Sequence, residues 1–214
     1  FRSRIQVCAM SFKENLKSLV WADYISALIM DPRLFAVKIS ESKRRILPSS
    51  LMISFLALFS VLLSFSILLP QSEFFYYKIS YGLVLGYIIL LMTLFIFALS
   101  ADFVFQYLGF PGKGARIFSV LNYSLFPFIF ILPGVVIFNS IELAPVAVLA
   151  LAVLVIAALI YSVYFLVSVL SEMNSAPVLT ALAAVFVPLI VLSIAGVLCF
   201  ISLLGVFYGF IVNL

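Results

Sequence analysis

Long apolar runs without a charged residue divide most of the chain. No Lys, Arg, Asp or Glu occurs between Arg45 and Glu73, and four further charge-free runs follow. An α-helix rises 1.5 Å per residue, so about 20 residues cross the ~30 Å hydrocarbon core of a bilayer. None of the runs shows the apolar–polar alternation of a barrel strand. The pattern predicts five membrane-spanning helices at residues 47–69, 79–101, 117–138, 143–170 and 178–205.

Composition supports the same class of protein. Hydrophobic residues make up 66% of the 214-residue chain and charged residues 9%, against about 45–50% and about 25% in soluble domains. Buried helices of a soluble core would run shorter and keep a polar stripe. We therefore expect an all-α, polytopic transmembrane helical bundle over residues 47–214, preceded by a basic segment at residues 1–46.

The number of spans depends on the last run, from Val178 to Leu214. As one straight helix it would measure roughly 55 Å, more than a tilted span needs. It is either one span with an apolar tail or two short spans that turn near Ser193 to Gly196. Because no polar turn interrupts the run, five spans are the favoured count.

The positive charges predict the orientation. Nine Lys or Arg residues precede residue 46, and Lys113 and Arg116 lie between the second and third spans, whereas the alternate side holds only Lys78. Cytoplasmic loops carry the excess of Lys and Arg. The N-terminus is therefore expected in the cytoplasm, with the protein in a bacterial cytoplasmic membrane. A natural start at Met10 would leave nine against one, so the predicted orientation does not depend on the start site.

Residues 1–46 carry the signals of two amphipathic helices at the membrane interface. Ser11 and Glu14 fit a capping box, apolar residues follow at helical spacing up to Leu28, and Asp31-Pro32 is typical of a second helix start. Basic side chains gain about 1 kcal/mol each beside anionic lipid. A solvated juxtamembrane face without a specific partner is the open alternative. The expected lipid or partner contacts are Lys13, Lys17, Trp21, Lys43, Arg44, Arg45, Lys113 and Arg116.

Polar residues and prolines interrupt the third predicted span. Asn122 and Tyr123 lie near its expected cytoplasmic end, followed by Pro127 and Pro133. A proline removes a backbone hydrogen bond and kinks a helix, and the freed carbonyls need partners or a cavity. These four residues form a candidate intramembrane polar or kink site. The favoured interpretation is a kinked packing helix, and a polar cleft or flexible joint is the alternative.

Two pairs of glycines are spaced four residues apart within predicted spans: Gly82 with Gly86, and Gly205 with Gly209. Small residues at this spacing let helix backbones approach closely. Packing within the chain is the favoured interpretation, and a homo-oligomer face is the alternative.

The sequence offers little for catalysis. It has no His, its two cysteines Cys8 and Cys199 form no metal or redox motif, and no nucleotide-binding or metalloprotease motif occurs. No acidic residue is predicted at mid-bilayer, which argues against an ion-driven pump. We expect a non-enzymatic protein without metal or cofactor. Its expected partners are membrane lipids, with a protein partner or a second copy left open, and no nucleic acid.

Three segments resemble the Yip domain family of Ypt/Rab-interacting membrane proteins, in particular its short bacterial-type members. They are Asp31 to Phe35, the glycine-rich basic loop from Leu108 to Gly114, and Asn122-Tyr123-Ser124 with Pro127. The resemblance covers residues 27–214 and implies five helices with a cytoplasmic N-terminus. The chain lacks the Asp-Leu-Tyr-Gly-Pro motif of eukaryotic members, so binding to Rab GTPases is not carried over.

Two functions follow as hypotheses. The first is a membrane organiser or scaffold whose basic helices and loop recruit a protein partner or anionic lipid. The second is a transport component for lipid translocation or a small solute, motivated by the kinked third span.

Overall fold

A computed structural model describes residues 26–29, 31–41, 46–68, 75–139 and 144–212, and every regular element in these ranges is helical. The expected all-α bundle is therefore confirmed. The elements are α3 (Pro32–Glu41), α4 (Ile46–Leu68), α5 (Phe75–Tyr107), α6 (Gly114–Ser124), the 3₁₀ helix η1 (Phe126–Phe130), α7 (Ile131–Asn139), α8 (Ala144–Asn174) and α9 (Val178–Val212).

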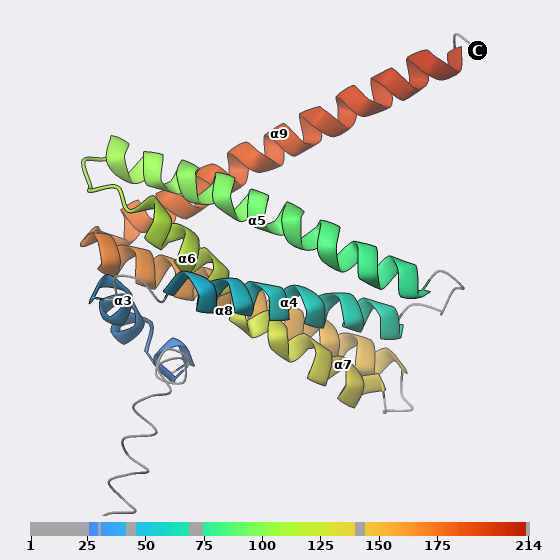
Figure 1. Cartoon of the computed structure of the whole chain (residues 1–214), viewed down its shortest axis with the longest axis horizontal. Coiled ribbons are helices and arrows are strands. Elements are labelled where there is room, and N and C mark those ends of the chain that lie inside the picture. Colours follow the sequence, from blue (N-terminus) through green and yellow to red (C-terminus); the bar gives the residue numbers. More distant parts are fainter. Residues whose placement is uncertain (1–25, 30, 42–45, 69–74, 140–143, 213–214) are drawn as a thin grey trace, which may run out of the picture.

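Four segments are long and apolar enough to cross a membrane: Ile46–Leu68, Ile79–Tyr107, Gly114–Phe138 and Val148–Asn174. They run alternately up and down the long axis of the bundle, with α6, η1 and α7 forming one interrupted rod (Figure 1). Their outer faces carry large apolar side chains, such as Met92 at 66% exposed and Ile160 at 65%. Such a surface is stable in lipid rather than in water, so the chain is an integral membrane protein.

The fifth apolar run forms one helix, α9, which continues through Ser193 and Gly196 without a turn. Its first half packs on α5 and α8, and its second half leaves the bundle at an angle (Figure 1). The 35 residues of α9 span about 52 Å at 1.5 Å each. Because α9 is continuous, it favours one span over two.

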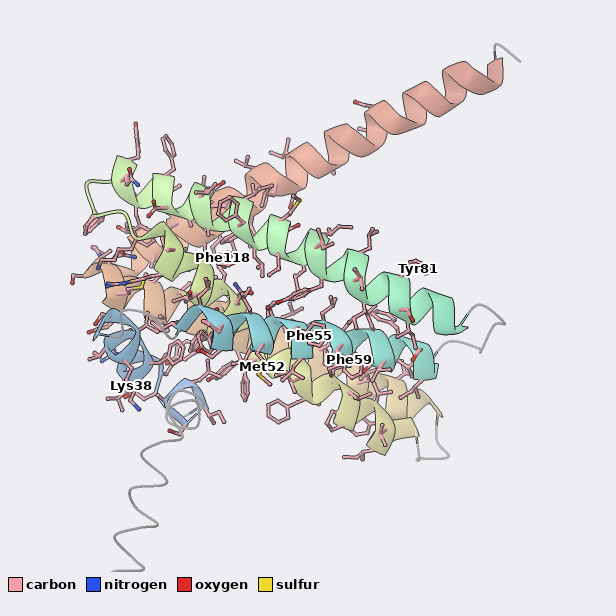
Figure 2. The ribbon with its side chains drawn as sticks, viewed as in Figure 1. Lys38, Met52, Phe55, Phe59, Tyr81 and Phe118 are labelled. Carbon is pink, nitrogen blue, oxygen red and sulfur yellow. The ribbon has the colours of Figure 1, made fainter. Side chains whose placement is uncertain are left out.

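One face of α4 forms the centre of the bundle. It carries small buried residues at helical spacing, and the helix as a whole packs against α5, α6, η1 and α7. Large rings fill the gap toward α5, where Phe55 and Tyr87 meet edge to face at 5.3 Å, and the Tyr87 hydroxyl donates to the Leu51 carbonyl at 2.8 Å. Phe55 is visible in this side-chain layer (Figure 2). The small buried residues of this face are Ser50, Ser54, Ala57, Ser60 and Ser64.

Helix α5 extends beyond the predicted span of 79–101. It continues through Asp102 and Gln106 to Tyr107, and the chain then turns at Gly109, whose φ is +85°. The Phe110 amide donates to the Phe105 carbonyl at 2.9 Å, which is the hydrogen bond of a glycine-terminated helix end. A charged residue therefore marks where the apolar run stops, while the helix stops at the glycine.

Helix α3 is docked against the C-terminal half of α8. Phe35 and Ile39 are fully buried, and the Phe35 ring lies 4.8 Å from that of Tyr123 and 5.2 Å from that of Phe165. The Tyr161 hydroxyl donates to the Leu28 carbonyl at 2.7 Å. We use the name α3 end for the end of the bundle formed by α3, the last turns of α8 and the loop that holds Lys113. Lys38 of α3 lies there (Figure 2). Of the first predicted N-terminal helix, only residues 26–29 are described, and they are helical.

Candidate functional site

The third span is broken where the sequence places its prolines. Helix α6 ends at Ser124, η1 covers Phe126–Phe130, and α7 begins at Ile131. Pro127 lies at the start of η1, and Pro133 lies in the first turn of α7. Because proline has no N–H, the carbonyl four residues before it loses its helical partner. Each such group needs another donor at this depth.

Ser60 of α4 supplies the partners at the second proline. Its hydroxyl donates to the Ile129 carbonyl at 2.9 Å, which is the carbonyl that Pro133 leaves free. The same oxygen accepts from the Leu132 amide at 3.0 Å. One buried serine, 3% exposed, therefore satisfies a donor and an acceptor of the interrupted backbone.

Two further contacts stabilise the end of α6, just before the break. Ser162 of α8 donates its hydroxyl between the Ser124 carbonyl at 2.7 Å and the Ala158 carbonyl at 2.8 Å. The Tyr123 hydroxyl lies 2.5 Å from that of Ser49 on α4. Hydroxyls from both flanking helices thus meet the polar groups of the broken span. This geometry favours the kinked packing helix over a polar cleft.

Asn122 is the exception within this site. Its side chain is 0% exposed, and its amide nitrogen donates to the Phe118 carbonyl at 2.8 Å. Its Oδ1 atom has no hydrogen-bond partner. Sequence reasoning selected Asn122 for its polarity and place, and the structure adds that its acceptor is unsatisfied, an uncommon state for a buried group.

The glycine-rich loop after α5 is tied to two helix ends. The backbone amide of Lys113 donates to Asp102 Oδ1 at 2.7 Å. The side-chain amide of Gln106 donates to Asp102 Oδ2 at 2.8 Å. The Lys113 ammonium donates to the Met173 carbonyl in the last turn of α8, where a cation also suits the helix dipole. A Cβ at Gly112 would lie 2.4 Å from Gln106 Nε2, so a larger residue there would have to displace the end of the Gln106 side chain.

The predicted basic contacts are only partly described. Lys113 and Arg116 are both half-buried at the α3 end, and Lys113 has the structural contact given above. The other predicted contacts lie outside the described residues, and their roles stay predictions: Lys13, Lys17, Trp21, Lys43, Arg44 and Arg45.

The glycine pairs differ in their surroundings. A Cβ at Gly86 would lie 3.8 Å from Leu58 of α4, whereas one at Gly82 would meet nothing within 4 Å. Gly205 and Gly209 belong to α9, in a stretch whose side-chain surroundings lie outside the described residues. A closer approach occurs at Gly134, which was not selected from the sequence because it has no glycine partner four residues away; its Cβ would lie 3.2 Å from Leu154 of α8.

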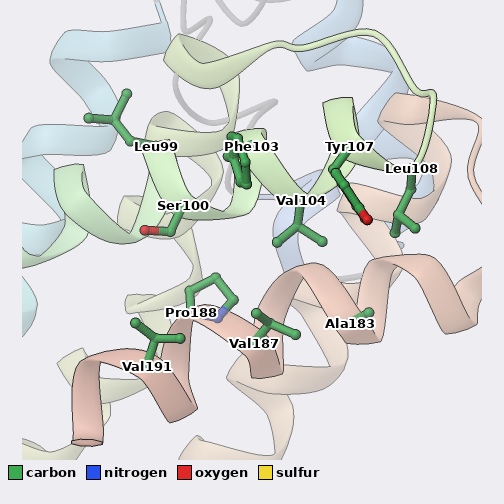
Figure 3. A pocket seen from close by; sticks show the side chains of 10 residues that line it. All are labelled: Leu99, Ser100, Phe103, Val104, Tyr107, Leu108, Ala183, Val187, Pro188 and Val191. Carbon is green, nitrogen blue, oxygen red and sulfur yellow. The ribbon is translucent and has the colours of Figure 1, made fainter. Parts of the chain in front are cut away.

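Apolar grooves open on the sides of the bundle. One, of about 730 Å³, lies between α5 and α9 and is lined by side chains such as Phe103, Val104, Val187 and Pro188 (Figure 3). Another, of about 510 Å³, lies beside the broken span between α4, η1, α7 and α8, and Ser64 is its polar residue. Such linings suit lipid chains better than a polar solute.

Within the described ranges no group of three or more His, Cys, Asp or Glu residues is arranged to hold a metal ion. Comparisons with known protein families, with curated proteins and with solved structures find no match. Function must therefore be argued from the chain itself.

Proposed function

We propose that the protein is a non-enzymatic membrane organiser of the Yip type, whose basic α3 end recruits anionic lipid or a protein partner. The supporting observation is that two basic segments, separated by two spans in the sequence, both attach to the C-terminal third of α8. The N-terminal segment does so through Phe35 on Phe165, and the loop does so through Lys113 on Met173.

Grouping of charge at one end gives the proposal its physical basis. Each Lys or Arg near an anionic surface contributes about 1 kcal/mol, and charges within a Debye length of about 8 Å act together. The contacts of α3 and of the Lys113 loop with α8 bring the two basic segments to the same end of the bundle. The first predicted amphipathic helix, which begins at Ser11, would extend this basic surface along the cytoplasmic leaflet of a bacterial membrane.

Neutralisation of this surface tests the proposal. The variant carries Gln at Lys13, Lys17, Lys43, Arg44, Arg45 and Arg116, and Lys78→Gln, at the start of α5, is the matched control. The full chain is placed in nanodiscs of phosphatidylcholine with a minority of phosphatidylglycerol, and the lipids retained are counted by native mass spectrometry.

We expect the wild type and Lys78→Gln to enrich phosphatidylglycerol, and the neutralised variant to lose roughly tenfold or more of that preference. Affinity purification in mild detergent tests recruitment of a protein partner. A partner recovered with the wild type and lost with the neutralised variant would support it. If the neutralised variant matches the wild type in both assays, the proposal is wrong.

The transport hypothesis has one observation in its favour, the buried Asn122 Oδ1 without a partner beside a broken helix. Vesicles reconstituted with the protein would then show faster lipid flip-flop or solute flux than empty vesicles, and Asn122→Leu would reduce the rate. Flux equal to that of empty vesicles would exclude it. The serine contacts at the break favour the organiser.

A further inference from the structure

A groove of about 700 Å³ follows one face of α8 and differs from the other two in having charged residues in its lining. Its walls come from α8, from the first turns of α9 at Val178 and Leu182, and from the start of α3 at Asp31, Pro32 and Arg33. An apolar groove that borders one acidic and one basic side chain is complementary to a ligand with an apolar chain and a head group that carries both charges.

The dimensions of the groove fit one lipid leaflet. Its α8 wall runs from Leu159 to Ser168, which is about 13 Å at 1.5 Å per residue. Half of the ~30 Å hydrocarbon core is similar in depth. The α8 wall lies inside the membrane-crossing segment Val148–Asn174 and is mostly apolar. An acyl chain is therefore the occupant that the walls suit.

Two residues of opposite charge, Asp31 and Arg33, lie at the groove. Asp31 caps α3, with its Oδ1 accepting from the Arg33 amide at 2.8 Å, and a carboxylate keeps a second oxygen for other donors. The Arg33 side chain is exposed, and a guanidinium binds phosphate through paired N–H donors. An ammonium beside a phosphate is complementary to this pair.

We propose that this groove is a binding site for an aminophospholipid of the phosphatidylethanolamine class. Arg33 binds the phosphate, Asp31 accepts from the primary ammonium, and one acyl chain lies along α8 between Leu159 and Val167. The site is separate from the basic surface that the proposed function uses, and it does not depend on that function.

Groove-dependent binding is measured by blocking the groove. Ile160 lines it and is 65% exposed, so Ile160→Trp fills the groove without disturbing the core. Val153→Trp is the matched control, since Val153 is 60% exposed on the same helix. Delipidated full-length protein is titrated with dioleoyl phosphatidylethanolamine, phosphatidylcholine or phosphatidylglycerol and followed by native mass spectrometry.

We expect the binding that Ile160→Trp removes, and Val153→Trp keeps, to be strongest for phosphatidylethanolamine. Phosphatidylcholine has no N–H on its ammonium, and phosphatidylglycerol has no ammonium. Arg33→Gln should weaken this binding roughly tenfold or more, as for loss of a charge-assisted hydrogen bond. Asp31→Asn, which preserves the helix cap, should reduce it to the phosphatidylcholine level.

Equal groove-dependent binding of the three lipids, a preference for phosphatidylglycerol, or binding indifferent to both charge variants would overturn the proposal. A dimer that is lost with Ile160→Trp and unaffected by phosphatidylethanolamine would assign the groove to a second copy instead. The variants of the basic surface keep both Asp31 and Arg33, so failure of one proposal leaves the other standing.

Discussion

At the scale of single residues, the broken third span depends on Ser60. Its hydroxyl serves the Ile129 carbonyl and the Leu132 amide together. Ser60→Ala leaves both backbone groups unpaired in an apolar layer, where each unsatisfied group costs about 1–3 kcal/mol. Interhelical hydrogen bonds in membranes average only about 0.6 kcal/mol, so the two costs are not added in full. We expect the free energy of unfolding to fall by roughly 1–3 kcal/mol.

The matched control for Ser60 lies on the same helix. Ser66 donates only to the Leu63 carbonyl within its own turn, at 2.7 Å, so Ser66→Ala should change stability by less than about 0.5 kcal/mol. Thermal unfolding in detergent compares the variants, and amide hydrogen exchange across residues 126–133 locates the effect. Equal stability of the two variants would mean that the break does not depend on the serine.

Only half of this site was predictable from the sequence. Pro127 and Pro133 predict a break because the effect of proline on a helix is local. Ser60 was not selected because a serine in an apolar run resembles an ordinary span residue, and its partner Ile129 lies 69 residues away. The spacing of the serines on one face of α4 was the signal that could have found it.

At the scale of elements, α3 should detach when its central ring is removed. Phe35 is 0% exposed and Leu34 is 56% exposed. Phe35→Ala removes contacts with Tyr123 and Phe165, and truncation of a buried Phe costs about 3–5 kcal/mol. Leu34→Ala, one residue away on the outer face, should leave the docking unchanged.

Thiol labelling reads out this docking. Ile39 is fully buried, so Ile39→Cys, in a chain with Cys8 and Cys199 replaced by Ser, should react slowly with a maleimide. Adding Phe35→Ala should raise the rate roughly a hundredfold, the factor for about 3 kcal/mol. If Phe35→Ala and Leu34→Ala give the same rate, α3 is not held by this ring.

Helix ends were less predictable than helix positions. The span at 47–69 is observed as α4 at Ile46–Leu68, which is also where this described range ends. The span at 79–101 lies within α5, which is longer at both ends. Charge reports where lipid contact ends, whereas hydrogen bonding and Gly109 determine where the helix ends.

At the scale of the whole molecule, the charge-free runs predicted that the spans cross the membrane in alternating directions. They did not predict which helices pack against one another. The sequence did not indicate that α3 packs on the bundle, where Phe35 and Ile39 are buried. Such docking depends on rings from α6 and α8, 88 and 130 positions beyond Phe35. No local pattern reports contacts at that distance.

The continuous α9 makes a prediction about topology. With one span after α8, the C-terminus lies on the opposite side of the membrane from the α3 end, whereas two spans would return it to the same side. In the Cys8→Ser, Cys199→Ser background, Asn213→Cys and Pro111→Cys place single thiols at the C-terminus and in the exposed loop after α5. An impermeant maleimide added to intact cells should label Asn213→Cys and spare Pro111→Cys, which should react only after permeabilisation. Labelling of both positions from the same side would require a turn within α9 and six spans.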